Sequence, residues 1–271
     1  MTPSDKRRTF RALHESGCFV IPNPWNVGSA RYLQGLGFKA LATTSSGFAH
    51  SQGLADGAVP RESMLAHCRK IASAVDVPVN ADFEGGYADD PEGVAESVRL
   101  CVETGVAGLS IEDFTGNDAD PLYVFDLAVA RVKAARKAID AAGGGDLVFT
   151  ARSEGFIKAR PDMAETIRRL KAFADAGADC LYAPGIRTPE QIETIVKAVA
   201  PMPVNLLMSS ASGLTVKDIA GLGVRRISVG GTLARVAMHA FIKSASEIAN
   251  NGEFDSFAGV VSNAELNKFF T

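Results

Sequence analysis

The sequence lacks the features that mark several specialised classes of protein. Its four cysteines, Cys18, Cys68, Cys101 and Cys180, are scattered and show none of the short paired spacings of zinc ligands. We therefore expect buried thiols in a reducing compartment. No stretch approaches the ~18 unbroken apolar residues of a membrane span, and the N-terminal residues lack the apolar run of a signal peptide.

Positive charge is also scarce. The 28 lysines and arginines are outnumbered by 31 aspartates and glutamates, which leaves a formal net charge of −3. Without a basic surplus, neither nucleic acid nor an anionic membrane surface is expected as a partner. Together these absences predict a soluble, cytoplasmic protein.

The chain does have enough apolar residues for a large core. Hydrophobic residues make up 46% of its 271 residues. This length is normal for an α/β barrel, which typically has about 250 residues. No low-complexity linker or change of composition divides the chain, so we expect one domain that spans residues 1–271.

A repeated pattern runs along the chain. Short apolar segments end in polar or small residues and give way to amphipathic helices. The expected strands cover residues 18–24, 40–46, 77–84, 108–114, 147–154, 180–185, 203–209 and 225–231. The expected helices cover residues 4–15, 27–36, 61–74, 91–105, 126–142, 163–177, 188–199, 215–221 and 233–250, with an extra one at 262–269.

Near-continuous apolar strands that alternate with helices favour a parallel sheet. Eight such units favour closure into a (β/α)8 TIM barrel with an additional C-terminal helix. An open doubly wound sheet is the alternative, but no GxGxxG motif follows the first strand.

Acidic residues end two neighbouring strands of this pattern. Asp82 closes the third expected strand and Glu112 closes the fourth. The carboxyl ends of parallel strands meet on the ligand side of a barrel, so both carboxylates could reach one divalent cation such as Mg²⁺. A pair of solvated or salt-bridged acids is the alternative. Glu84 and Asp113 are neighbours that could point the other way.

Arg152 ends the fifth expected strand, in the sequence TARSEGF. Its planar fork suits bidentate binding of a substrate carboxylate. An ion pair with Glu154 or Glu112 is the alternative. Lys158 follows soon after but lies outside the strand, which gives little support to a Schiff-base mechanism.

Small residues end the second strand, in the run Ser45-Ser46-Gly47-Phe48. Such residues let backbone N–H groups approach an anionic oxygen. A tight turn would require the same residue types. The glycines Gly230-Gly231 at the end of the eighth strand also have two interpretations: they could form a phosphate-binding site or a tight turn. His50 is the histidine nearest to the expected mouth.

These motifs resemble those of the isocitrate lyase/phosphoenolpyruvate mutase superfamily over nearly the whole chain. Each motif is short, but their order and their placement at successive strand ends make the combination fairly specific. The matching segments are Ser29-Ala30-Arg31, Ser46-Gly47, Asp56 in GLADG, NADFEGGY at 80–87, IED at 111–113 and Ala151-Arg152.

The resemblance implies a barrel whose last helix is exchanged between the subunits of a homodimer or homotetramer. It also implies Mg²⁺ or Mn²⁺ as cofactor and a small 2-oxo acid as substrate. Carried over by motif, Asp82 would hold the metal directly or through water, and Glu112 would hold metal-bound water. Asp56 and Asn80 would contact the waters around the ion.

For the substrate, the resemblance implies that Arg152 meets its carboxylate and that Ser46 and Gly47 bind its oxo-acid end. Catalysis would then rest on Arg152, Ser46, Gly47 and Asp56. The other expected substrate contacts are Ser45, Phe48 and Asn205.

Two positions depart from the superfamily pattern. The loop at 114–122 contains no cysteine, histidine or lysine, where the lyases carry Lys-Cys-Gly-His. Asn80 replaces the first aspartate of an Asp-x-Asp pair. We therefore expect a Mg²⁺- or Mn²⁺-dependent carbon–carbon lyase that decarboxylates oxaloacetate or cleaves a related 2-oxo acid. The alternatives are phosphonopyruvate hydrolysis or phosphoenolpyruvate mutase chemistry, and an oxo-acid-binding barrel without turnover.

Overall fold

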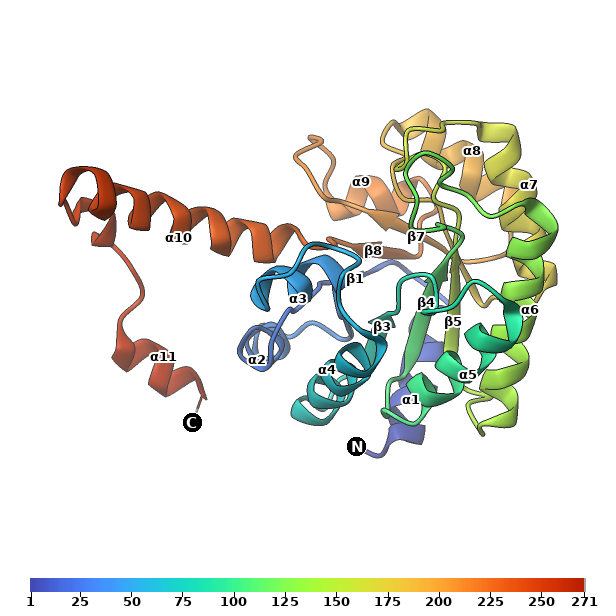
Figure 1. The fold of residues 1–271 in the computed structure, drawn as a ribbon, viewed down its shortest axis with the longest axis horizontal. Helices are drawn as coiled ribbons and strands as arrows, with labels where there is room; N and C mark the ends of the chain where they lie inside the picture. Colours follow the sequence, from blue (N-terminus) through green and yellow to red (C-terminus); the bar gives the residue numbers. More distant parts are fainter. Residues whose placement is uncertain (271) are drawn as a thin grey trace.

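The computed structural model describes residues 1–270 and contains one parallel sheet in the order β1-β8-β7-β6-β5-β4-β3-β2. The strands are β1 Phe19–Ile21, β2 Leu41–Ala42, β3 Val79–Asp82, β4 Gly108–Glu112, β5 Val148–Arg152, β6 Cys180–Tyr182, β7 Val204–Leu207 and β8 Arg226–Ser228. β1 pairs with β8, and the N–H of Ala42 donates to the carbonyl of Pro22 at 3.1 Å, which brings β2 beside β1. The predicted (β/α)8 TIM barrel is confirmed (Figure 1).

Most of the helices surround this barrel at close to the predicted positions. The helices are α1 Pro3–Leu13, α2 Val27–Gly35, α3 Ser45–Ser51, α4 Arg61–Ala74, α5 Pro91–Val102, α6 Phe125–Ala141, α7 Met163–Asp175, α8 Pro189–Val199, α9 Val216–Gly221, α10 Thr232–Asn251, the 3₁₀ turn η1 Asp255–Phe257 and α11 Asn263–Phe270. Several starts follow simple capping chemistry. At α5, for example, the Asp90 side chain accepts the N–H of Gly93 and Pro91 is the first helical residue. None of the helices within residues 1–270 has the length and apolar character to cross a membrane.

The largest departure from the predicted elements lies after β2. The strand ends at Ala42 instead of residue 46, and α3, which the sequence reading does not predict, begins at Ser45. The hydroxyl of Thr44 accepts the N–H of Gly47 at 3.2 Å and so caps this helix. The serines and glycine expected at a strand end therefore form the first turn of a helix, and Ser45 and Ser46 of this turn line the cavity at the mouth of the barrel.

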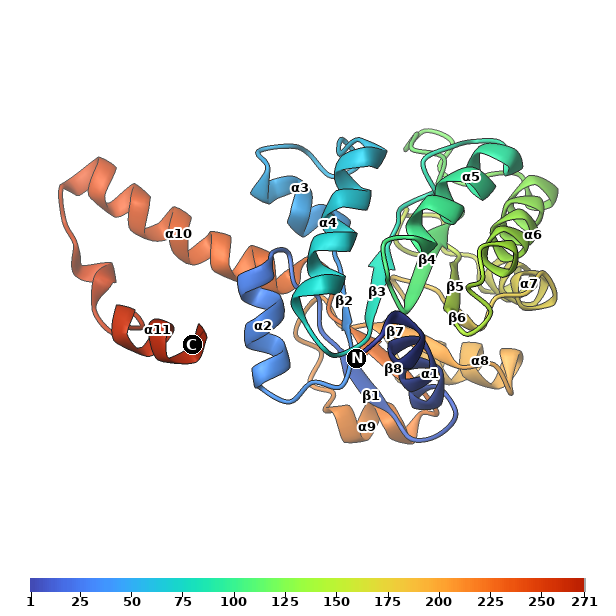
Figure 2. The same ribbon diagram turned by 90° about the horizontal axis from the view of Figure 1, so that it is seen from below.

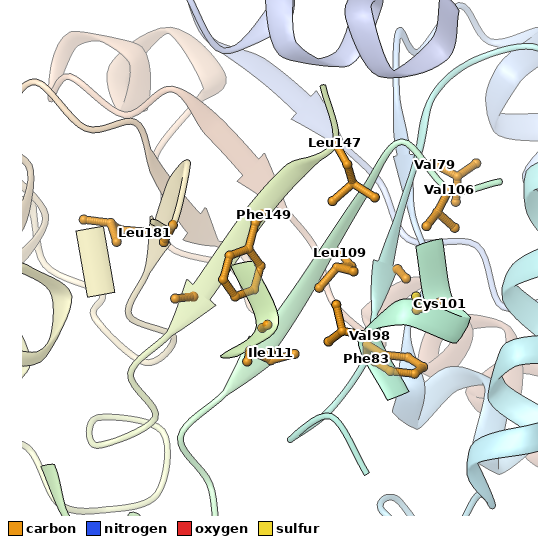
Figure 3. Packing of buried hydrophobic residues seen from close by; sticks show 14 of the residues in the cluster. Val79, Phe83, Val98, Cys101, Val106, Leu109, Ile111, Leu147, Phe149 and Leu181 are labelled. Atoms are coloured by element: carbon orange, nitrogen blue, oxygen red, sulfur yellow. The ribbon is translucent and has the colours of Figure 1, made fainter. Parts of the chain in front are cut away.

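The core lies between the sheet and the surrounding helices. Leu109 of β4 and Phe149 of β5 are fully buried among apolar side chains from α4 to α7 (Figure 3). A second cluster closes the bottom of the barrel, where Phe10 of α1 packs against Ala107 and Val148 at the amino ends of two strands. The bottom is thus sealed by apolar contacts, and the carboxyl ends of the strands stay open.

The C-terminal segment leaves the barrel as an arm (Figures 1 and 2). α10 has no buried residue, and its Phe241 is 65% exposed. α11 returns to α2, where the rings of Phe269 and Tyr32 lie 4.5 Å apart. Gly35 permits this approach, because a Cβ there would lie 2.5 Å from the Phe269 ring. The additional C-terminal helix is confirmed, and its exchange between subunits stays a prediction.

Candidate active site

A cavity of about 960 Å³ opens at the carboxyl ends of the strands, and all eight strands contribute residues to its wall. Its charges are unevenly distributed. The acids on the wall are Asp56, Asp82, Glu84, Asp89, Glu112, Asp118 and Glu154. All of them come from β3 to β5 or from the loops that follow β2 to β5. From Tyr182 onward, the described wall contains Arg226 and Arg235 and no acid.

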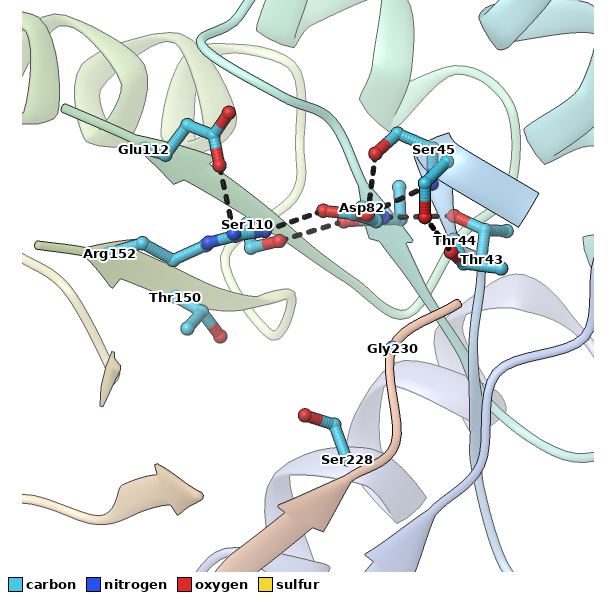
Figure 4. Close-up of polar contacts among 12 residues, drawn as sticks. Thr43, Thr44, Ser45, Asp82, Ser110, Glu112, Thr150, Arg152, Ser228 and Gly230 are labelled. Carbon is cyan, nitrogen blue, oxygen red and sulfur yellow. Dashed lines mark hydrogen bonds and ion pairs between the residues drawn. The ribbon is translucent and has the colours of Figure 1, made fainter. Parts of the chain in front are cut away.

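Arg152 stands at the centre of the acidic side (Figure 4). Its Nη1 lies 2.8 Å from Asp82 Oδ1, its Nη2 lies 2.9 Å from Glu112 Oε2, and its Nε lies 2.9 Å from Glu154 Oε1. Strand register explains the cluster, because Glu112 and Arg152 are direct partners across β4 and β5. The structure therefore joins the two predicted cation ligands and the predicted carboxylate-binding residue in one ion-pair network.

Burial sets the protonation behaviour of this network. It raises the pKa of Glu112 well above the usual value, and Arg152 offsets only part of the effect. Burial alone would lower the pKa of Arg152, but Glu112, Glu154 and Asp82 together raise it well above the ordinary arginine value. Arg152 is thus a fixed positive charge that partly opposes the effect of burial on Glu112.

Asp82 is held in place by the end of β2. The backbone N–H and the hydroxyl of Ser45 donate to Asp82 Oδ2 at 2.9 and 3.0 Å, and the N–H of Asp82 donates to Thr43 Oγ1 at 2.9 Å. Ser45 thus uses its donors on the carboxylate expected to hold the cation. It lines the cavity, but it acts on Asp82.

The other residues predicted around the substrate divide into two groups. Ser46 and Asn205 lie on the cavity wall, and a Cβ at residue 231 would lie 2.5 Å from the Ser46 hydroxyl, so Gly231 leaves room for that side chain. Gly47 lies behind the wall, where its N–H donates to Thr44 and it borders a smaller pocket shared with His50. Phe48 stacks on His67 at 3.9 Å between ring centroids. The structure does not bring Gly47 or Phe48 to the main cavity.

The two alternate acids behave differently. Asp113 points away from the cavity: its Oδ2 pairs with Arg169 at 3.0 Å, and its Oδ1 accepts the N–H of Glu154 at 2.8 Å. Glu84 instead lines the cavity, and its backbone is left-handed with φ of 47°. Burial, followed by the charge of Asp82, raises the pKa of Glu84 to about 7.

The loop after β3 is fixed by a residue that sequence reasoning missed. Arg131 of α6 is 1% exposed and donates to the carbonyls of Gly85, Ala88 and Asp89. Its guanidinium also lies 4.0 Å from the centre of the Tyr123 ring. The available signal was its position on the apolar stripe of α6, between buried Ala128 and Ala135.

Lys158, which the sequence reading considered only for a Schiff-base mechanism, brings positive charge to the loop at 114–122. Lys158, from the loop after β5, lines the cavity. Its Nζ lies 3.3 Å from Asp118 Oδ1 and 3.3 Å from the centre of the Phe114 ring. The loop contains no cation of its own, but the fold places one beside it.

The donor set fits a hard divalent cation. The acidic side offers only oxygen ligands, and its carboxylates outnumber the nearby cations Arg152 and Lys158. In the described part of the chain, Glu84 Oε1 and Asn80 Oδ1 are buried without a hydrogen-bond partner. Burial, followed by the charge of Asp82, also raises the pKa of Asp56. A cation would relieve this concentration of negative charge.

Protein ligands alone do not complete such a site. Within residues 1–270, no three acidic, histidine or cysteine side chains converge closely enough to cage an ion. Mg²⁺ commonly takes one or two carboxylates and keeps several waters. Asp82 and Glu112 are the residues that would hold it here. Asp56 and Asn80, both on the cavity wall, would face its waters.

Fold and site together define a TIM barrel with an acidic cavity at its catalytic end. Residues 10–249 match the family described as phosphoenolpyruvate phosphomutase, and the chain belongs to this family, within the phosphoenolpyruvate mutase/isocitrate lyase superfamily. The superfamily contains lyases and mutases, so the resemblance inferred from the strand-end motifs is confirmed.

Three similar proteins illustrate the range of this family. A Burkholderia cenocepacia structure, described only provisionally as a lyase or mutase, is 44% identical, with a TM-score of 0.94 over 99% of this chain and 96% of that one. Oxaloacetate decarboxylase of Paraburkholderia xenovorans is 31% identical over 83% of this chain and 75% of that protein. Phosphonopyruvate hydrolase, solved with oxalate and Mg²⁺, is 26% identical, with a TM-score of 0.86 over 100% of this chain and 95% of that one.

Proposed function

We propose that this protein is a Mg²⁺- or Mn²⁺-dependent lyase that acts on a small 2-oxo acid, with decarboxylation of oxaloacetate as its reaction. The observation that carries the proposal is the placement of Arg152 between Asp82 and Glu112 at the mouth of the barrel. This arrangement combines a group for a substrate carboxylate with oxygen ligands for a cation. Oxaloacetate decarboxylase and the oxalate–Mg²⁺ complex of phosphonopyruvate hydrolase among the similar proteins support it.

The reaction needs little from the protein beyond charge and position. The bond between C3 and C4 of oxaloacetate breaks, CO₂ leaves, and the electron pair remains as the enolate of pyruvate. A proton from solvent then adds to C3. A bound Mg²⁺ or Mn²⁺, held by Asp82 and Glu112, would supply Lewis-acid polarisation of the 2-oxo group. No thiol acid is required, which agrees with the loop at 114–122.

The chain's own groups would have separate tasks. Arg152 would bind the substrate carboxylate through its fork of N–H donors. Ser46, with its hydroxyl on the cavity wall, would bind the oxo-acid end, and Asn205 would face the substrate from β7. Ser45 would keep Asp82 oriented through the two hydrogen bonds described above.

The test is pyruvate formation from oxaloacetate by purified protein with Mg²⁺ or Mn²⁺, measured against the rate with metal alone. We expect a protein-dependent rate that Asp82→Asn abolishes. Asp118→Asn is the matched control, because Asp118 is an exposed acid at the rim of the same cavity. A wild-type rate no faster than metal alone would refute the proposal.

One observation favours a second candidate, hydrolysis or rearrangement of phosphonopyruvate. Lys158 lies beside the 114–122 loop and would offer a cation to a phosphonyl group at that end of the cavity. Phosphorus NMR of the protein with phosphonopyruvate would show inorganic phosphate or phosphoenolpyruvate under this alternative. An unchanged spectrum, with oxaloacetate consumed in parallel, would exclude it.

We also propose a cytoplasmic homodimer or homotetramer. The exposed apolar side chains of α10, including Val236, Phe241 and Ile242, support association. Light scattering on the purified protein would give the mass, and a monomer at micromolar concentration would contradict this part of the proposal.

A further inference from the structure

The guanidinium of Arg152 is almost fully occupied by its neighbours. It has five N–H donors. Nε contacts Glu154 Oε1 at 2.9 Å, Nη1 contacts Asp82 Oδ1 at 2.8 Å, and Nη2 contacts both Glu112 Oε2 at 2.9 Å and Glu154 Oε2 at 3.2 Å. Hydrogen bonds use one N–H on each of these nitrogens, and the Glu112 carboxylate lies against Nη2 as an ion pair. A substrate carboxylate that binds Nη1 and Nη2 together would meet Asp82 and Glu112 at the same nitrogens, so Arg152 must give up a partner.

The three acidic partners are not equivalent. The Glu154 side chain is 3% exposed and holds Arg152 through both of its carboxylate oxygens. Its backbone N–H donates to Asp113, which is itself paired with Arg169, so this partner is tied into the wall. The Asp82 and Glu112 side chains are 18% and 13% exposed and each contacts Arg152 through a single oxygen.

Release of Asp82 and Glu112 has an electrostatic cost. Without the guanidinium of Arg152, the two partly buried carboxylates repel each other and lose charge-assisted interactions. A divalent metal ion bound to the same carboxylate oxygens would remove that cost. Conversely, a cation at these oxygens would repel Arg152 unless a new anion met the freed N–H groups. The cation and the substrate carboxylate therefore favour each other through Arg152.

From this geometry we infer that Glu154 is a positioning residue. It retains Arg152 while Arg152 exchanges Asp82 and Glu112 for the substrate carboxylate, and this exchange couples binding of the cation to binding of the oxo acid. The inference rests on the proposed function and extends it to the way in which cation binding and substrate binding strengthen each other. Thermodynamic reciprocity requires each ligand to raise the affinity of the other by the same factor.

The experiment measures Mn²⁺ binding by electron paramagnetic resonance of the free ion, with and without saturating propionate, at constant ionic strength. Propionate offers a carboxylate but no 2-oxo group, so it cannot chelate the ion as an oxo acid does. In the wild type we expect propionate to tighten Mn²⁺ binding about 5-fold or more, within the usual range of coupling between sites. Chelation of the ion through a 2-oxo group therefore cannot produce this result.

Two variants isolate the role of Glu154. Glu154→Gln should reduce the propionate effect to less than twofold, while Glu96→Gln should leave it unchanged. Glu96 is a suitable control because it pairs with Arg99 on α5 and is not part of the cavity wall. Arg152→Lys, which keeps the charge but lacks the fork, should also lose the coupling and serves if Glu154→Gln does not fold.

The outcomes separate this inference from the proposed function. Full coupling in folded Glu154→Gln, or in Arg152→Lys, would overturn the inference and leave the proposed function intact. Wild-type protein that binds Mn²⁺ and propionate independently would do the same. A wild type that binds no Mn²⁺, even with oxalate present, would overturn both.

Discussion

The two sides of the cavity differ in charge although the same strand–helix repeat builds them. From β3 to β5, carboxylates surround Arg152. On β8, Arg226 is 3% exposed and donates to Asn205 at 2.8 Å, to Thr150 at 3.0 Å and to His14 at 3.3 Å, all of them neutral acceptors.

This comparison shows how one barrel can separate two electrostatic tasks. On the acidic side, negative charge exceeds positive charge, so a divalent cation and an exchangeable arginine can be accommodated. On the β7–β8 side, one buried cation is satisfied by amide, hydroxyl and imidazole groups, and Asn205 also donates to Ser228 at 2.9 Å. We interpret the first side as chemically active and the second as mainly structural, apart from the expected substrate contact at Asn205.

The largest effect should follow from removing one carboxylate on the acidic side. We expect Asp82→Asn to lower the cation-dependent rate with oxaloacetate by about 100-fold, because changing even an outer partner of a metal site typically costs about 10- to 100-fold and Asp82 is the expected ligand itself. Pyruvate release and Mn²⁺ affinity should fall together. Unchanged Mn²⁺ affinity in this variant would show that the cation binds elsewhere.

Removal of the cation on the β8 side should act mainly on stability. We expect Arg226→Met to lower the free energy of unfolding by about 2–3 kcal/mol, because buried acceptors on Asn205 and Thr150 lose their donor. Urea denaturation would measure this loss, with Arg225→Met as the neighbouring control. If Arg226→Met unfolded like wild type but lost Mn²⁺ binding, the division between the two sides would be wrong.

His14, which contacts Arg226 of β8, should make the folded protein less stable in acid. Burial and the nearby Arg226 lower the pKa of His14 from 6.5 to about 3. Between these two pKa values, His14 is protonated in the unfolded chain and neutral in the folded chain. The free energy of unfolding therefore decreases as the pH falls from about 6.5 toward 3, by up to ~1.4 kcal/mol per pH unit. Urea midpoints across this range should fall less steeply in His14→Gln than in wild type or His239→Gln. Parallel slopes in all three proteins would contradict the assignment.

The acidic side should show the opposite and smaller dependence. Because the pKa of Glu84 is raised from 4.5 to about 7, the folded chain holds a proton that the unfolded chain releases. Its contribution to stability is present below pH 4.5 and is lost as the pH rises toward 7. Glu84→Gln should reduce that loss, whereas Glu92→Gln should not. A Glu84→Gln profile that follows wild type from pH 4.5 to 7 would show that the carboxyl is ionised throughout.

Much of the acidic side could be predicted from the sequence. Polar residues that end apolar strands must meet at one end of a parallel barrel, and this rule alone brings Asp82, Glu112 and Arg152 together. The same rule does not say how side chains pair once they meet. The substrate-binding and ion-pair interpretations of Arg152 were therefore separate alternatives, whereas the structure shows the ion pairs at the predicted site.

The rest of the site depends on contacts between distant segments. Arg131 reaches the β3 loop from α6, and Lys158 reaches the 114–122 loop from beyond β5. No local pattern specifies such meetings, because they arise only when the helices pack. The start of α3 is different, because the local sequence allows two structures there. Thr44 is a recognisable helix cap, but the small residues that follow it are also typical of a turn. In the structure Thr44 caps a helix.

The most direct test of the account is a thermal-shift titration with Mg²⁺ plus oxalate, a mimic of the pyruvate enolate, on wild type and Asp82→Asn. A ligand that binds only the folded state stabilises it by about 2.7 kcal/mol at a hundredfold excess over its dissociation constant. We expect a clear Mg²⁺-dependent shift in wild type and none in Asp82→Asn. Equal shifts in the two proteins, or none in either, would contradict the assignment of the cation and oxo-acid site to the acidic side.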